Sequence, residues 1–166
     1  AVAEHNPQIL PMGEVSIIAA ASILHDIGKV GIADDVLLHP NKLSSAQFEQ
    51  MKQHAPIGAD ILIALSEQLG PDPWIDTAIQ IALGHHERWD GTGYPNGVEA
   101  CNIPLAARIV AVADVYDALT SERVYKNSIP HQEAVEIIAK EKGKHFDPMV
   151  VDAFLSKLEE VRAINE

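Results

Sequence analysis

The sequence feature that most constrains the fold is an apolar run at residues 15–24 that leads directly into His25 and Asp26. A run of this length without glycine or proline predicts a helix, and its lack of charge predicts that the helix is buried. Gly28 follows as a typical helix terminator. Packing requires neither an imidazole nor a carboxylate at the end of a buried helix. Adjacent residues there point to different sides, so His25 and Asp26 could face neighbouring metal ions, although an isolated pair of this kind is more often incidental.

Helical patterns cover most of the remaining chain, and no stretch shows the alternation of apolar and polar residues that is typical of a strand. Ser44 and Gln47 have the spacing of a capping box, and Asp147 followed by Pro148 is a typical helix start. A long loop rich in glycine and proline spans residues 87–103, and loops of this length are often functional. The sequence therefore predicts an all-α protein, with helices at residues 14–27, 44–54, 57–69, 74–86, 104–120, 130–142 and 147–161.

Composition limits the class of protein and its partners. With 166 residues, 47% of them hydrophobic, the chain is large enough for one domain with a real core. Its 24 acidic and 12 basic residues give a net charge of −12, which argues against nucleic-acid polymers as partners because they require a basic face. No apolar run reaches the roughly 18 residues of a membrane span. The single cysteine, Cys101, excludes an internal disulfide and fits a reducing compartment, so we expect a cytoplasmic location.

Other polar residues stand at positions where packing alone does not require them. Asp114 lies in the middle of an apolar predicted helix, where an unpaired carboxylate would cost several kcal/mol. It is as often the ion-pair partner of an arginine, here Arg108 or Arg123, as a metal ligand. His54 ends a predicted helix and, taken alone, is more often a surface histidine than a ligand.

Two adjacent histidines, His85 and His86, close another apolar predicted helix and are harder to explain by packing. Together with His25, Asp26, His54 and Asp114, these histidines give more candidate ligands than one tetrahedral zinc ion can bind. Mixed imidazole and carboxylate ligands suit two octahedral ions such as Fe or Mn, and an aspartate can bridge two cations. Two such ions can generate a hydroxide nucleophile and clamp a phosphoryl group. The predicted metal ligands are His25, Asp26, His54, His85, His86 and Asp114.

The loop after His85 carries the motif that identifies a family. Residues 85–95 read H-H-E-R-W-D-G-T-G-Y-P, and together with the His25-Asp26 pair they resemble the signature of the HD-GYP domain. The resemblance implies an HD-type helical bundle over residues 1–166 that binds two or three divalent metal ions, with Fe or Mn expected. It implies a phosphodiesterase that hydrolyses cyclic di-GMP to pGpG, GMP or both by attack of a metal-bridging hydroxide. The six ligands named above match the family's metal-binding positions.

The same resemblance assigns residues to the substrate. Asp26 and Lys29 are expected to be catalytic, Asp26 by bridging the metal ions and Lys29 by neutralising charge on the scissile phosphate. Three of the residues below are cationic, namely Lys29, Arg123 and Lys126. Each of them, taken singly, is more often a solvated surface charge. The residues expected to contact or border the substrate are Lys29, Gly93, Tyr94, Pro95, Arg123 and Lys126.

One departure from the family concerns its first helix. The family has a further histidine farther upstream of the His-Asp pair than the 24 residues that precede His25 here. We therefore expect the chain to be truncated within that helix and to follow an upstream sensory or receiver domain. An uncovered helix at residues 14–27 would favour self-association, for example as a homodimer. Two alternatives stay open, namely an inactive output module that binds signalling proteins and a phosphohydrolase that acts on another nucleotide.

Overall fold

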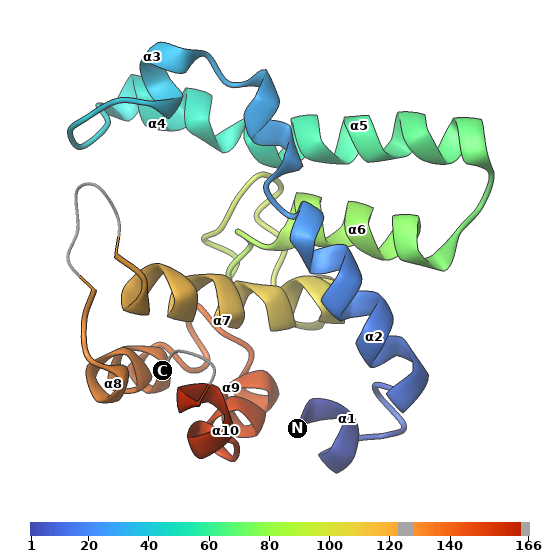
Figure 1. Ribbon diagram of the computed structural model, residues 1–166, viewed down its shortest axis with the longest axis vertical. Helices are drawn as coiled ribbons and strands as arrows, with labels where there is room; N and C mark the ends of the chain where they lie inside the picture. Colours follow the sequence, from blue (N-terminus) through green and yellow to red (C-terminus); the bar gives the residue numbers. More distant parts are fainter. Residues whose placement is uncertain (123–127, 164–166) are drawn as a thin grey trace.

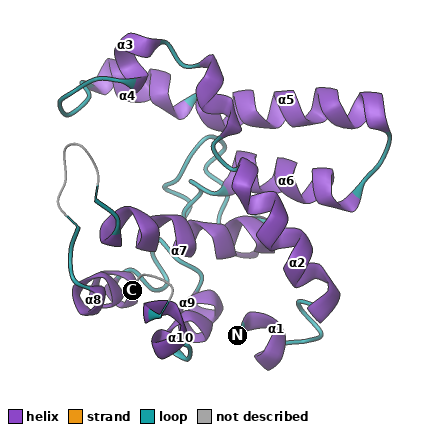
Figure 2. Cartoon of the chain, viewed as in Figure 1, coloured by secondary structure: helices purple, strands orange, loops and turns teal. Residues whose placement is uncertain are grey.

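Helices are the regular elements of the computed structural model, which describes residues 1–122 and 128–163 (Figure 2). Within these ranges no strand forms, and Lys142 and Phe146 make one isolated bridge. None of the described helices is both long and apolar enough to cross a membrane. The predicted all-α class is confirmed.

The α-helices of the described residues vary from single turns to four turns. Three short 3₁₀ segments, Ser22–Leu24, Ile27–Gly31 and Ala100–Asn102, interrupt the connections between them. The α-helices are α1 (Val2–His5), α2 (Met12–Ala21), α3 (Asp34–Leu37), α4 (Ser45–Lys52), α5 (His54–Leu69), α6 (Pro73–Gly84), α7 (Leu105–Thr120), α8 (His131–Lys140), α9 (Pro148–Leu155) and α10 (Leu158–Arg162).

Helix α6 lies in the middle of the molecule and packs against α5, α2 and α7 (Figure 1). Several residues at these contacts are alanines, and their small side chains let the helix axes approach closely. Helix α7 has a second buried face, against α8 and α9. The core around α6 consists of the buried residues Ala21, Leu62, Ala78, Ile81, Ala82, Ala106 and Val110.

The predicted helix over residues 14–27 is wrong in its second half. Helix α2 ends at Ala21, a 3₁₀ turn follows, and His25 and Asp26 lie in the irregular backbone after it. Beyond this break, the backbone of Gly28 packs directly against the backbone of His54 and Gly58 on α5. The helix is also less buried than expected, since Ala21 alone of α2 is fully buried.

Other helix ends follow local rules. Ser44 and Gln47 form the predicted capping box, with Ser44 N–H donating to Gln47 Oε1 at 3.0 Å and Gln47 N–H to Ser44 Oγ at 3.3 Å. Helix α5 begins at His54 rather than after Pro56, since a proline in the first turn removes no helical hydrogen bond. The predicted helix 147–161 is divided into α9 and α10.

The loop after α6 is held to the segment after α8. Trp89 N–H donates to His145 O at 3.0 Å, and Asp90 N–H donates to Lys144 O at 2.9 Å. The His145 ring stacks on Phe146 with centroids 4.1 Å apart. Burial, and then the charge of Arg88, lower the pKa of His145 to about 4.

This lowered pKa predicts a pH dependence of stability. Unfolding returns the imidazole to its ordinary pKa of 6.5, so the unfolded chain binds more protons as the pH falls from 6.5 to about 4. The free energy of unfolding should therefore decrease with falling pH in this window. His145→Phe, which keeps a stacking ring, should lose less stability than the wild type in urea unfolding between about pH 7.5 and about pH 5. An equal loss in both proteins would contradict the prediction, and His5→Phe, at an exposed histidine, is the control.

Candidate metal centre

Four of the predicted ligands converge where the break after α2 meets α5 and α6. Asp26, His54, His85 and His86 each place one ligand atom within 4.8 Å of the others. His54 Nε2 lies 3.1 Å from His86 Nε2 and 3.4 Å from Asp26 Oδ1. His54 and His85 are almost completely buried, each 2% exposed.

The other two predicted ligands, His25 and Asp114, lie next to each other, and His25 lies beside the second carboxylate oxygen of Asp26. His25 Nε2 is 3.3 Å from Asp26 Oδ2 and 3.7 Å from Asp114 Oδ1, which comes from α7. The two carboxylate oxygens of Asp26 thus face different groups of residues. Oδ1 faces His54, and also His85 at 4.0 Å, whereas Oδ2 faces His25. The structure brings all six predicted ligands into one site.

Three of the histidines are oriented by the same hydrogen bond. Nδ1 lies 2.7 Å from Ser22 O in His25, 2.7 Å from Met51 O in His54 and 2.9 Å from Ile81 O in His85. An Nδ1–H that donates to a backbone carbonyl leaves Nε2 as the free lone pair, which is the usual arrangement of a metal-binding histidine. His85 Nε2 is buried and has no hydrogen-bond partner among the described residues. A metal ion would satisfy it, so these residues fit a metal centre.

The protonation states also suit metal binding. Burial lowers the pKa of His85 to about 4 and that of His86 to about 2. Burial opposes ionisation of Asp26, but hydrogen bonds from His25 and Lys29 outweigh it and hold the pKa of this carboxyl well below its usual value. The hydrogen bond to Asp26 raises the pKa of His25. His85 and His86 are therefore neutral imidazoles and Asp26 is an ionised carboxylate, which are the forms that bind metal ions.

Two of the residues predicted to contact substrate, Lys29 and Tyr94, lie against this centre, and Gly93 and Pro95 flank Tyr94 in the chain. Lys29 Nζ lies 2.5 Å from Asp26 Oδ2. The ring of Tyr94 stacks on His86 with centroids 4.7 Å apart, and Tyr94 N–H donates to His86 O at 3.2 Å. Gly93 permits this approach, because a Cβ there would lie 2.3 Å from Arg88 N. Arg123 and Lys126 lie outside the described residues.

Two findings were not expected from the sequence. Arg108 forms a buried ion pair with Asp147 at 2.6 Å and not with Asp114. Phe48 and Lys52, on α4, lie beside Tyr94. Phe48 and Lys52 are four residues apart, which places them on one face of a helix just before His54. This spacing is the sequence signal that points to a shared surface.

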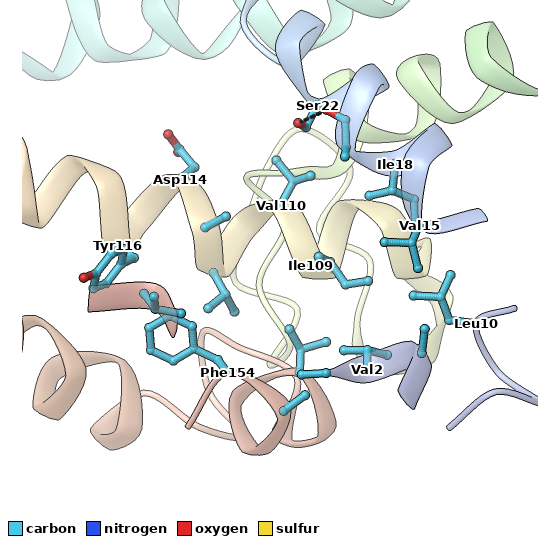
Figure 3. Close-up of a pocket in the computed structure, with 18 of the residues that line it drawn as sticks. Val2, Leu10, Val15, Ile18, Ser22, Ile109, Val110, Asp114, Tyr116 and Phe154 are labelled. Atoms are coloured by element: carbon cyan, nitrogen blue, oxygen red, sulfur yellow. Dashed lines mark hydrogen bonds between the residues drawn. The ribbon is translucent and has the colours of Figure 1, made fainter. Parts of the chain in front are cut away.

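An apolar cavity of about 640 Å³ lies next to the centre, between α2, α7 and α9 (Figure 3). Ser22 and Asp114 lie at one end of it, and Val2 and Phe154 lie at the other. Its walls are otherwise mostly apolar, so a charged ligand would lose hydration there without gaining polar partners. The polar centre, and not this cavity, is the candidate site for an anionic substrate.

Several known proteins are similar to this chain in sequence. The HD domain family matches residues 8–150. A cyclic di-GMP phosphodiesterase of Vibrio cholerae is 47% identical over 94% of this chain and 32% of its own length. A probable cyclic di-GMP phosphodiesterase of the same organism is 52% identical over 81% of this chain and 31% of its own length. The chain thus spans about a third of the length of these relatives.

A solved structure has the same fold. The crystal structure of a cyclic GMP-AMP specific phosphodiesterase of V. cholerae superimposes with a TM-score of 0.64 over 97% of this chain and 42% of its own. Its sequence is 20% identical, so the comparison supports the arrangement of helices and not the choice of substrate.

Proposed function

The chain belongs to the HD domain family, and we propose that it is a metal-dependent phosphodiesterase that hydrolyses cyclic di-GMP. The observation that carries the proposal is the position of Asp26, whose two carboxylate oxygens face two different groups of ligands. A carboxylate in this position can bridge two cations. The relatives that carry the name cyclic di-GMP phosphodiesterase support the choice of substrate.

We assign two divalent ions to the centre, Fe or Mn, because the ligands are imidazoles and carboxylates without a thiolate. Asp26, His54, His85 and His86 would hold one ion, and His25, Asp26 and Asp114 would hold the other. Bound there, the ions would activate a water molecule and neutralise charge on the phosphate. The Nδ1 hydrogen bonds to backbone carbonyls fix the rings of His25, His54 and His85, so these three ligands are oriented before a metal binds.

The remaining roles follow from charge and position. Lys29, beside Asp26, would attract a phosphate oxygen and offset the negative charge that develops during hydrolysis. Gly93, Tyr94 and Pro95 would border the substrate next to His86. Arg123 and Lys126 are proposed as further phosphate contacts. The proposed products are pGpG, GMP or both.

Two alternatives compete with this proposal. An inactive output module needs no intact centre, and the convergence of all six expected ligands argues against it. A phosphohydrolase for another nucleotide would share the centre and differ in the residues around it. Cyclic GMP-AMP is the comparison substrate, since the superimposable structure belongs to a protein named for it.

Turnover assays decide between these readings. With Mn²⁺ or Fe²⁺ the chain should convert cyclic di-GMP to pGpG or GMP faster than it converts cyclic GMP-AMP, as followed by chromatography of the products. Chelation should abolish the reaction, and added Mn²⁺ should restore it. Faster turnover of cyclic GMP-AMP would favour the second alternative. No turnover of either nucleotide by metal-loaded protein would favour the inactive module.

Several expectations from the sequence stay predictions. These are the cytoplasmic location, the homodimer, the truncation of the first helix, and the upstream sensory or receiver domain with its signalling partners. If a ligand is supplied from upstream, the present chain should bind metal more weakly than a longer one.

A further inference from the structure

An exposed aromatic and cationic surface borders the metal centre. Phe48 is 46% exposed on α4, and its ring meets that of Tyr94 edge to face with centroids 6.2 Å apart. Lys52 Nζ lies 5.3 Å from the centroid of Phe48 and 5.5 Å from that of Tyr94. We call Phe48 and Lys52, together with the Tyr94 ring, the α4 platform.

The α4 platform is connected to the centre through ring contacts. Tyr94 stacks on His86, so two ring contacts separate Phe48 from a proposed metal ligand. Helix α4 lies at the end of the molecule that also holds α5, and α5 begins with His54 (Figure 1). A ligand whose phosphate lies at the centre could therefore place an attached ring over Phe48.

The residue types on the platform suit a purine. Phe48 is about half exposed, so a base can reach its ring, and every base has a π-face for such a contact. The ammonium of Lys52 can donate to O6 and N7 of guanine, whereas adenine presents an amino group in place of O6. Lys52 now pairs with Glu49 at 2.7 Å, and Glu49 is largely exposed. Surface ion pairs contribute at most about 1 kcal/mol, so this pair would hinder ligand binding little.

We propose that the α4 platform is a guanine subsite, in which Phe48 stacks on one base of the substrate and Lys52 selects guanine over adenine. This inference rests on the proposed function, because it requires that a phosphate of the same nucleotide lies at the metal centre. It goes beyond the family motif, which contains Tyr94 but neither Phe48 nor Lys52.

Kinetics of Phe48 variants test the stacking contact. Phe48→Ala should raise KM for cyclic di-GMP at least about fivefold, the lower range for loss of one base–aromatic stack, with a smaller change in kcat. Phe48→Trp should keep KM close to the wild type, whereas Phe48→Leu, which is apolar without a π-face, should resemble Phe48→Ala. Leu69→Ala, at a leucine that is 71% exposed at the end of α5, is the control and should leave KM unchanged. Unchanged KM in Phe48→Ala would overturn the stacking role.

Binding to Lys52→Met tests the selection of guanine. The wild type should bind cyclic di-GMP more tightly than cyclic di-AMP in titration calorimetry, and Lys52→Met should reduce this ratio by weakening the binding of cyclic di-GMP. An unchanged ratio would overturn the role of Lys52 and return it to an ordinary surface charge. Wild-type protein that hydrolyses bis(p-nitrophenyl) phosphate but neither binds nor cleaves cyclic di-GMP would overturn the proposed substrate, and the subsite with it.

Discussion

Asp26→Ala should lower kcat for cyclic di-GMP by at least about a thousandfold, which corresponds to roughly 4 kcal/mol of transition-state stabilisation. The reason is that both oxygens of Asp26 face proposed ligands, so the substitution removes a ligand from both ions at once. Metal content measured by plasma mass spectrometry should fall for both sites. His54→Ala should weaken mainly one of them.

The control for this experiment is Asp60→Ala, at an exposed carboxylate on the same helix as His54. It should keep wild-type metal content and turnover. Wild-type metal content in Asp26→Ala would show that Asp26 is not the bridge, even if activity were lost.

Gly28→Ala should lower the free energy of unfolding by more than about 4 kcal/mol, a loss found only where a substitution meets a specific structural conflict. A Cβ at this position would lie 1.9 Å from His54 O and 2.4 Å from Gly58 N. Both are backbone atoms of α5, so no side-chain rotation can relieve the overlap. Urea unfolding followed by circular dichroism measures the effect.

Gly13→Ala is the matched control, since a Cβ there meets nothing within 4 Å. This glycine lies in α2, so alanine should leave stability unchanged or raise it by up to about 1 kcal/mol. Equal stability of Gly28→Ala and the wild type would mean that the contact between Gly28 and α5 is looser than the structure shows. The same contact sets the distance between Asp26 and His54, so metal affinity should fall together with stability.

The helices and the candidate ligands could be predicted because their signals are local. Turn residues and apolar periodicity mark most helix ends, and histidines that close an apolar helix, such as His85 and His86, are not required there by packing. The family resemblance that these residues indicated is confirmed by the match over residues 8–150. The assignment of each ligand to an ion stays a prediction.

The features that could not be predicted depend on contacts between distant residues. No residue before Gly28 marks the break after Ala21, and the contact that Gly28 then makes is with the backbone of α5, which is distant in sequence. Arg108 could pair with Asp114 or with Asp147. Its pairing with Asp147 follows from the packing of α7 near the start of α9. The contact of Phe48 with Tyr94 could not be predicted, because Tyr94 lies in a loop whose position the sequence does not specify.

Anomalous diffraction from crystals grown with Mn²⁺ is the most direct test of the metal centre. We predict one peak within bonding distance of Asp26, His54, His85 and His86, and a second within bonding distance of His25, Asp26 and Asp114. Asp26 should contact both peaks, one through each carboxylate oxygen. Strong peaks elsewhere in the molecule, with none at these residues, would contradict the account.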